Sequence, residues 1–170
     1  MDKIYELAIV GAGPAGIATA VESYIQGVKN IILLEKDTSH NSTIRKFYKD
    51  NKRVDVDWKG QKVELDGRIY FVDGTKESTL DFFDEIIEHH SVELQTHVEV
   101  VAIKKQEDFF EVEMAGETIK ATNVVVTIGR MGKPNKPSYK IPPNIRKRVN
   151  YTLDGCSEGE KVLVVGGGDS

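Results

Sequence analysis

The apolar residues of this chain fall into two patterns, short continuous runs and faces with helical spacing. Short continuous runs that are rich in β-branched residues are typical of buried strands. The strands predicted in this way lie at residues 7–10, 31–36, 123–127 and 161–165. Helical spacing predicts a helix over residues 75–90, whose apolar face consists of Leu80, Phe83, Ile86 and Ile87.

A glycine-rich loop separates the first two predicted strands. Its sequence is Gly11-Ala12-Gly13-Pro14-Ala15-Gly16, and it opens a predicted helix that ends near Gly27. The spacing G-x-G-x-x-G, placed between a strand and a helix, is typical of dinucleotide-binding proteins. Gly11 allows the tight turn, Gly13 allows a diphosphate to approach the backbone, and Gly16 allows the helix to lie close to the strand.

Two further residues strengthen this prediction. Pro14 suits the first turn of a helix, where its missing N–H would have no intrahelical partner. Glu35 closes the second strand, where a carboxylate can accept hydrogen bonds from ribose hydroxyls and would repel a 2′-phosphate. The loop therefore predicts a site for the ADP part of FAD or NAD, and fits NADP poorly. The alternative is a glycine-rich turn without a ligand.

Residues 92–120 have the pattern of short strands separated by polar or glycine turns. The predicted strands lie at residues 92–94, 98–104, 109–114 and 117–120, the last three forming an antiparallel meander. A meander inserted before the next parallel strand points toward flavoproteins rather than NAD dehydrogenases. The predicted fold class is α/β, a Rossmann-like FAD-binding domain with a parallel sheet and a β-meander, followed by the start of a second NAD(P)-binding Rossmann domain.

The polar segment after Glu35 contains one residue with acid or base chemistry, His40. In a nucleotide-binding fold this connection passes over the cofactor, so one interpretation is that residues 39–45 contact ribose or flavin. The alternative is a solvated loop. No partner for His40 can be identified from the sequence. His89 and His90 end the second predicted helix without further ligands at metal-binding spacing, so no metal site is expected.

Charge and cysteine content narrow the class of protein. The 170 residues carry a net charge of −4, which gives no support to nucleic-acid binding. Cys156 is the single cysteine, so an intramolecular disulfide and a C-x-x-C motif are excluded, which suits a reducing cytoplasm. Residues 7–21 are apolar, but they are short and rich in glycine, and we expect neither a signal peptide nor a membrane span there.

Residues 130–148 differ sharply from their surroundings. They contain seven of the 23 Lys and Arg residues, four of the five prolines and no acidic residue. One interpretation is a solvated interdomain linker that proline keeps extended. The other is a docking surface for an acidic partner or for phosphate.

A second glycine turn, Gly166-Gly167-Gly168, follows the apolar run at residues 161–165. Because a phosphate loop needs the helix that comes after it, we expect an amino-terminal piece of a longer protein with two nucleotide sites. The expected parts are an FAD-binding domain at residues 1–129, a connection at 130–158, and the first strand and glycine turn of an NADPH-binding domain at 159–170.

The chain resembles the low-molecular-weight thioredoxin reductases over its whole length. The resemblance rests on GAGPAG with Glu35, on TIG at residues 127–129, and on VLVVGGGDS; FYKDNKR, TIGRMGKPN and YKIP are closer to the NADPH-dependent flavodoxin:quinone reductases. By resemblance, FAD occupies the first glycine site and NADPH the second, at Gly166 and Gly168. The FAD-binding residues that the resemblance implies are Gly11, Gly13, Pro14, Ala15, Gly16, Glu35, Lys36, Val98, Thr127 and Gly129.

The departures from these families concern cysteine. Thioredoxin reductases carry C-x-x-C before an Asp-Gly pair; here Asp154-Gly155 is present, but Asn150 and Leu153 stand at the cysteine positions. Bacillithiol disulfide reductases carry a cysteine in the first glycine loop, where this chain has Ala15. Neither dithiol nor loop-thiol chemistry is therefore expected.

The resemblance implies an FAD-dependent oxidoreductase that passes hydride from NADPH to the flavin and electrons to an external acceptor, flavodoxin or a quinone. It implies a cytoplasmic homodimer for the whole protein, and no catalytic side chain is assigned. The 170-residue piece alone is expected to be inactive. Two alternatives stay open: a thioredoxin reductase-like disulfide reductase, and a non-catalytic module or fragment that binds a nucleotide.

Overall fold

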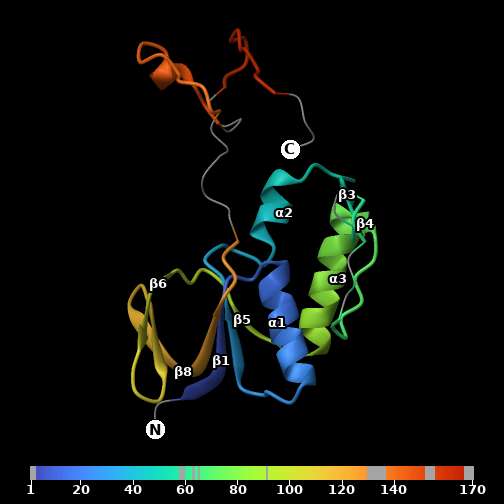
Figure 1. Ribbon diagram of the computed structural model, residues 1–170, viewed down its shortest axis with the longest axis vertical. Coiled ribbons are helices and arrows are strands. Elements are labelled where there is room, and N and C mark those ends of the chain that lie inside the picture. Colours follow the sequence, from blue (N-terminus) through green and yellow to red (C-terminus); the bar gives the residue numbers. More distant parts are fainter. Residues whose placement is uncertain are drawn as a thin grey trace. The chain divides into compact units, whose positions relative to one another are not determined.

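The chain divides into two compact units, Met1–Gly129 and Arg130–Ser170. A computed structural model describes residues 3–57, 60–62, 64, 66–90, 92–129, 137–151 and 156–166. All strands and α-helices of the described residues belong to the first unit (Figure 1). The described part of the second unit is irregular apart from one short 3-10 helix, η1 (Arg146–Arg148).

The first unit is built on a six-stranded sheet with the strand order β5-β2-β1-β8-β7-β6. Its strands are β1 (Ile4–Val10), β2 (Ile31–Leu34), β5 (Glu93–Gln95), β6 (Val100–Lys105), β7 (Phe110–Met114) and β8 (Glu117–Val126). The four strands β5, β2, β1 and β8 are parallel, whereas β6, β7 and β8 pair antiparallel. The predicted α/β class, with a parallel sheet and a meander, is confirmed.

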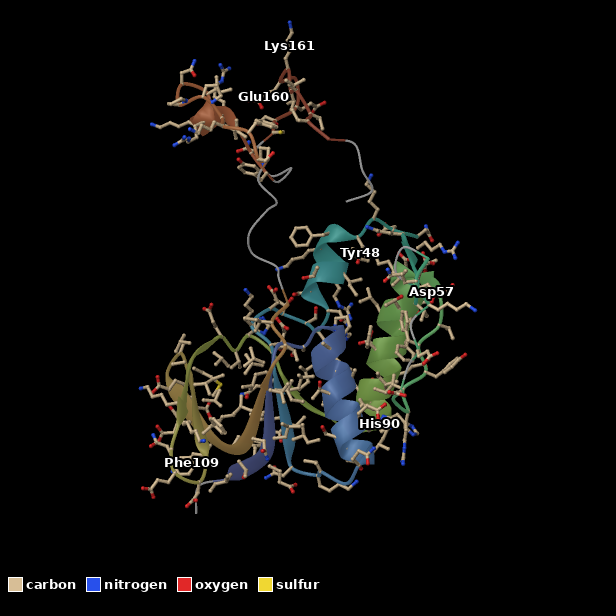
Figure 2. The ribbon with its side chains drawn as sticks, in the orientation of Figure 1. Tyr48, Asp57, His90, Phe109, Glu160 and Lys161 are labelled. Carbon is tan, nitrogen blue, oxygen red and sulfur yellow. The ribbon has the colours of Figure 1, made fainter. Side chains whose placement is uncertain are left out.

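Two helices, α1 (Pro14–Ile25) and α3 (Lys76–His89), lie side by side on one face of the sheet (Figure 1). Helix α3 begins with a capping box, in which Thr75 and Ser78 each donate a backbone N–H to the other's hydroxyl oxygen. Its last turn is followed by His90, labelled in Figure 2, whose ring packs edge-on against Tyr24 of α1. His90 therefore contributes to the packing of α3 against α1.

The connection from β2 to α3 contains a short helix, α2 (Ser42–Phe47), and a two-stranded sheet of β3 (Arg53–Val54) and β4 (Gly74–Thr75). Part of it was expected to be a loop at residues 39–45, and the structure corrects this. Ile44 of α2 is buried, and packing of an apolar side chain stabilises a helix too short to form alone.

Both faces of the central strands are covered by apolar side chains. On the helical face the buried cluster contains Leu7, Ile9, Ile17, Val21, Leu33 and Phe83. On the opposite face it contains Ala8, Ile32, Leu34, Val112, Met114 and Ala121, the last three from the meander. Strands covered on both faces have no polar face, which explains the continuous apolar runs in the sequence.

One strand, β8, replaces the two that the sequence predicts at residues 117–120 and 123–127. Its first half pairs with β7 and its second half with β1, and Ala121 pairs with both neighbours. The strand is also less buried than expected, because Val126 is 53% exposed. A local pattern cannot show that one strand serves two partners.

The strand predicted at residues 161–165 is absent from the described structure. Leu163, Val164 and Val165 lie in irregular backbone and are 87%, 76% and 73% exposed. A strand forms only where a neighbour satisfies its backbone groups, and the described residues supply no neighbour here. The described residues therefore show no strand here, and the start of a second nucleotide-binding domain stays a prediction.

Candidate functional site

The carboxyl ends of β1, β2 and β8 meet at one edge of the sheet. Val10 pairs with Leu34 on one side and with Val126 on the other. The loop after β1 therefore lies between the residues that follow the other two strands, Glu35 and Thr127. Ligands of open α/β sheets bind at this edge, so these three segments form the candidate site.

Two glycines of the loop are required by backbone contacts. Gly11 has φ +103°, and a Cβ there would lie 2.7 Å from the carbonyl oxygen of Thr127. A Cβ on Gly16 would lie 1.9 Å from the carbonyl oxygen of Gly11. These contacts agree with the roles that the sequence predicts for a tight turn and for close packing of helix on strand.

Gly13 differs from both, because a Cβ there would meet no heavy atom within 4 Å. Gly13 is the N-cap of α1, with Pro14 at the start of the helix and Pro14 and Ala15 both exposed. The free N–H groups of a helix start and its dipole attract anions. The open space before this helix therefore fits a phosphate group.

Glu35 is buried, with 6% of its surface exposed, and it ties two backbone segments together. Its Oε2 accepts a hydrogen bond from the Ala12 N–H at 2.9 Å, and its Oε1 accepts one from the Asp37 N–H at 2.9 Å. Each carboxylate oxygen has a second lone pair, so the carboxylate can still accept hydroxyl donors. Its position beside the glycine loop fits the ribose role that the sequence predicts.

Thr127 ties β8 to the loop. Its hydroxyl lies 2.8 Å from the carbonyl oxygen of Gly11, to which it donates, and its N–H donates to the Val10 carbonyl at 2.8 Å. Gly129, two residues later, is exposed with φ +65°. The structure thus brings Thr127 into the site, and gives Gly129 no contact that tests its predicted role.

Of the four remaining predicted residues, one lies beside the site, two are described without a contact to it, and one lies outside the described residues. Val98 lies beside Glu35, because its N–H donates to the Glu35 carbonyl at 2.8 Å. Lys36 is exposed. In the second unit Gly166 has φ +117°, whereas Gly168 lies outside the described residues. Cofactor contacts of all four stay predictions.

A cluster of polar side chains beside the glycine loop was missed by the sequence analysis. His40 is 5% exposed, and its Nε2 lies 2.5 Å from Oδ1 of Asp84 on α3. Asn41, 1% exposed, lies against the other ring nitrogen, and its N–H donates to the carbonyl oxygen of Ala12 in the loop. Because Asp84 is 44 residues away along the chain, no local pattern could have indicated the pair.

A second ion pair lies at the rim of this region. The Lys46 ammonium, 2.6 Å from Asp37, donates a hydrogen bond that lowers the pKa of the Asp37 carboxyl, and the Ser42 hydroxyl acts in the same direction. Among the described residues no three His, Cys, Asp or Glu side chains are grouped to hold a metal ion. In that same part of the chain no helix is long and apolar enough to cross a membrane.

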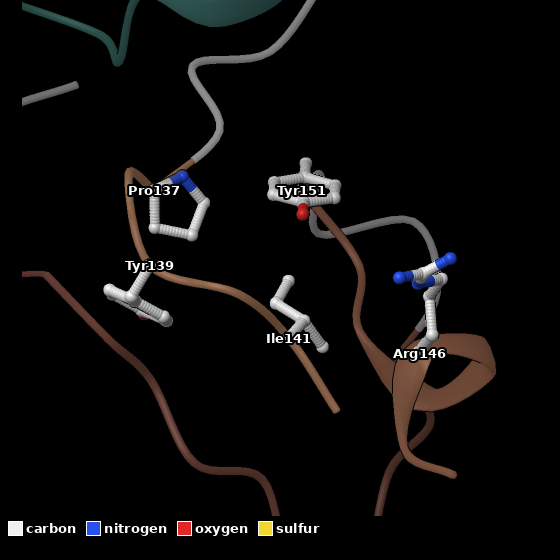
Figure 3. Close-up of a pocket in the computed structure, with 5 residues that line it drawn as sticks. All are labelled: Pro137, Tyr139, Ile141, Arg146 and Tyr151. Atoms are coloured by element: carbon white, nitrogen blue, oxygen red, sulfur yellow. The ribbon is translucent and has the colours of Figure 1, made fainter. Parts of the chain in front are cut away.

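The second unit presents a basic surface with a pocket. The pocket has a volume of about 350 Å³ and is lined by Pro137, Tyr139, Ile141, Arg146 and Tyr151 (Figure 3). The basic residues described between residues 137 and 151 are exposed: Lys140, Arg146, Lys147 and Arg148. Residues 130–136, the remaining basic part of the stretch, lie outside the described residues, as do Leu153, Asp154 and Gly155.

The fold and the site define a Rossmann-type dinucleotide-binding protein. The chain belongs to the family described as pyridine nucleotide-disulphide oxidoreductase, which it matches over residues 8–170. Membership confirms the predicted superfamily of thioredoxin reductase-like FAD/NAD(P) oxidoreductases. The flavodoxin-specific branch is a finer statement and is not confirmed.

Curated relatives carry the name ferredoxin–NADP reductase. The chain is 24% identical to that of Leuconostoc mesenteroides over 176 residues, which cover all of this chain and 48% of the relative. It is 26% identical to ferredoxin–NADP reductase 2 of Bacillus velezensis over 175 residues, with 99% and 48% covered. The chain thus spans about half the length of the curated relatives it matches.

Solved structures support the fold. The bacillithiol disulfide reductase of Bacillus cereus matches with a TM-score of 0.65 and 20% identity, covering 86% of this chain and 45% of the other. The ferredoxin-flavin thioredoxin reductase of Clostridium acetobutylicum matches with a TM-score of 0.58 and 20% identity, covering 78% and 40%. At these identities the likeness concerns the fold alone.

Proposed function

We propose that this chain is the FAD-binding part, with the start of the NADPH-binding part, of a flavoprotein reductase. The whole protein would take hydride from NADPH and pass electrons to a small acidic carrier of the flavodoxin or ferredoxin type. The observation that carries this proposal is the open glycine cradle before α1 with the Glu35 carboxylate beside it. Family membership and the names of the curated relatives support it.

Each part of the site has a binding role in this proposal. The N-terminus of α1 binds the diphosphate, because Gly13 leaves room for it and the helix dipole favours its charge. Glu35 accepts the ribose hydroxyls of the adenosine half. Thr127 fixes the loop to β8. When bound, FAD supplies the transfer of hydride and electrons, and these residues hold and orient it.

The cysteine content favours an electron carrier over a disulfide as the acceptor. Reduction through a protein dithiol needs two cysteines, and the sequence contains Cys156 alone, which is exposed. A glycine-loop thiol is replaced by Ala15. A dithiol within these 170 residues is thus excluded, and the proposal takes a second protein or a quinone as the acceptor.

The second unit supports an acidic carrier as the partner. The exposed cations of η1 and Lys140 form a surface without an acidic residue between residues 137 and 151. Opposite charge speeds the encounter of two proteins and orients them. Tyr139 and Tyr151 line the pocket together with Arg146 and offer aromatic contact area there (Figure 3).

The test is a flavin spectrum of the purified full-length protein, followed by NADPH oxidation with flavodoxin, ferredoxin, a quinone or a disulfide as acceptor. We expect one bound flavin per chain and fastest turnover with an acidic carrier. Fastest turnover with a disulfide would instead favour the disulfide reductase. Nucleotide binding without turnover would leave a non-catalytic module. Light scattering of the same sample tests the predicted homodimer, and fractionation of the source cells tests the predicted cytoplasmic location.

A further inference from the structure

Ala12, the second residue of the glycine loop, is held from two sides. Its N–H donates to Oε2 of Glu35 at 2.9 Å, and its carbonyl oxygen accepts the N–H of Asn41 at 2.8 Å. In a trans peptide the carbonyl and the following N–H point in opposite directions, and the described residues contain no cis peptide. The bond from Asn41 therefore fixes the direction of the Gly13 N–H at the start of α1.

Asn41 depends on His40 for its side-chain orientation. Asn41 is 1% exposed and has φ +52°, a left-handed conformation that asparagine tolerates better than most residues. Its Nδ2 donates to Nδ1 of His40 at 2.9 Å, whereas its Oδ1 has no hydrogen-bond partner among the described residues. The contact with His40 is thus the polar contact that fixes this side-chain amide.

His40 is itself held by two helices. Its Nδ1 lies 2.9 Å from Nδ2 of Asn41, and its Nε2 lies 2.5 Å from Oδ1 of Asp84 on α3 and 2.9 Å from a guanidinium nitrogen of Arg45. Arg45 of α2 donates its Nε–H to the carbonyl oxygen of His40 at 3.0 Å and lies 3.4 Å from Oδ2 of Asp84. Contacts at both ring nitrogens and at the backbone therefore hold the ring in a fixed position.

We propose that His40 is a positioning residue for the dinucleotide, which acts through Asn41 and Ala12 on the Gly13 N–H. Asp84, on the outer side of α3, fixes the ring and so contributes to cofactor affinity without touching the cofactor. This inference rests on the proposed FAD site. The competing view is that His40 only packs α2 against α3, in which case its loss changes stability and nothing at Gly13.

Three variants of the full-length protein separate these views. His40→Gln can place an amide donor near Asp84 but has no ring nitrogen at the position of Nδ1, which accepts from Asn41. Asp84→Asn keeps an oxygen acceptor but removes the charge. Asp81→Asn is the matched control, because Asp81 is exposed on the same helix and undergoes the same change in charge. The measurements are the FAD dissociation constant, the amide resonance of Gly13 without flavin, and the melting temperature without flavin.

We expect His40→Gln to weaken FAD binding by about tenfold, Asp84→Asn to weaken it less, and Asp81→Asn to leave it unchanged. The amide resonance of Gly13 should shift in the first two variants and stay in place in the control. The ³¹P resonances of bound FAD should shift with it, because they report the donors around the diphosphate.

A lower melting temperature with an unchanged Gly13 resonance and unchanged FAD affinity would overturn the inference. Absence of FAD binding in the wild-type protein would instead contradict the proposed function, while the Gly13 resonance would still test the role of His40. If His40→Gln does not fold, Asp84→Asn decides alone, since the Asp84 side chain is 53% exposed and its replacement disturbs little packing.

Discussion

Two apolar runs of similar composition have opposite structures in the two units. In β2 of the first unit, Ile32, Leu33 and Leu34 are at most 1% exposed, between β1 and β5 and beneath both apolar layers. In the second unit, Leu163 and Val164 are 87% and 76% exposed and form no strand. The difference lies in the neighbours, because a strand needs partners for its backbone and cover for its faces.

The two units also differ in charge and in what they can bind. In the candidate site of the first unit, two buried residues, Glu35 and Asn41, bond the backbone of the glycine loop. The basic surface of the second unit is exposed throughout η1. We infer a division in which the first unit holds the cofactor and the second meets the partner.

The largest expected effect concerns Gly16. Gly16→Ala places a Cβ 1.9 Å from the carbonyl oxygen of Gly11. Because this atom belongs to the backbone and not to a flexible side chain, the clash cannot be relieved cheaply, and the free energy of unfolding should fall by roughly 4 kcal/mol. Gly13→Ala is the control, because its Cβ meets open space and its stability should change by about 1 kcal/mol or less. Urea unfolding measures both.

The same pair sharpens the cofactor assignment. Gly13→Ala should lower the flavin content of the purified protein although its fold persists, because the added methyl group occupies the space proposed for the diphosphate. Full flavin content in this variant would show that the diphosphate does not bind at Gly13.

A second pair of substitutions compares the apolar runs directly. In the 170-residue chain Leu33→Ala should lower the free energy of unfolding by about 3 kcal/mol, since it leaves a cavity in a fully buried layer. Leu163→Ala should change it by about 0.5 kcal/mol or less, because the side chain is exposed. Equal losses in thermal or urea unfolding would show that the second run is buried in solution.

Charge reversal tests the division between cofactor site and docking surface. The variant Arg146→Glu, Lys147→Glu, Arg148→Glu should slow reduction of an acidic carrier by about tenfold at low salt, through loss of electrostatic attraction. The matched control reverses three exposed lysines of the first unit, Lys49, Lys62 and Lys105. Stopped-flow rates over a range of salt distinguish them, and equal slowing would contradict a specific surface on η1.

The smallest expected effect is acid sensitivity in the first unit. The hydrogen bond from Lys46 lowers the pKa of Asp37 below its usual value of 3.8, so the folded state binds this proton less readily than the unfolded state. The resulting stability is present above pH 3.8 and is lost as the pH falls through the lower folded pKa.

Asp37→Asn should therefore unfold with a shallower dependence on pH below 4. The difference should be about 0.5 kcal/mol, because water screens an exposed pair. Unfolding curves at pH 3 and pH 6 provide the measurement, and identical slopes for both proteins would refute the contribution of Asp37.

The sequence alone determined those parts of the protein that depend on residues close together in the chain. The glycine loop, Glu35 at the end of β2 and helix α3 were predicted from spacing, because a backbone turn, a strand end and an amphipathic face each depend on nearby residues. The parallel order and the meander followed from the order of the elements. These parts suffice to place the candidate site at the carboxyl ends of the strands.

Only the tertiary structure decided the features that depend on distant neighbours. Asp84 reaches His40 across 44 residues, β8 serves as one strand because it has a partner for each half, and α2 forms over the buried Ile44. The run at residues 161–165 stays irregular because the described residues give it no partner. The hydrophobic pattern shows which side chains of a segment can be buried, whereas the tertiary structure decides whether other elements cover them.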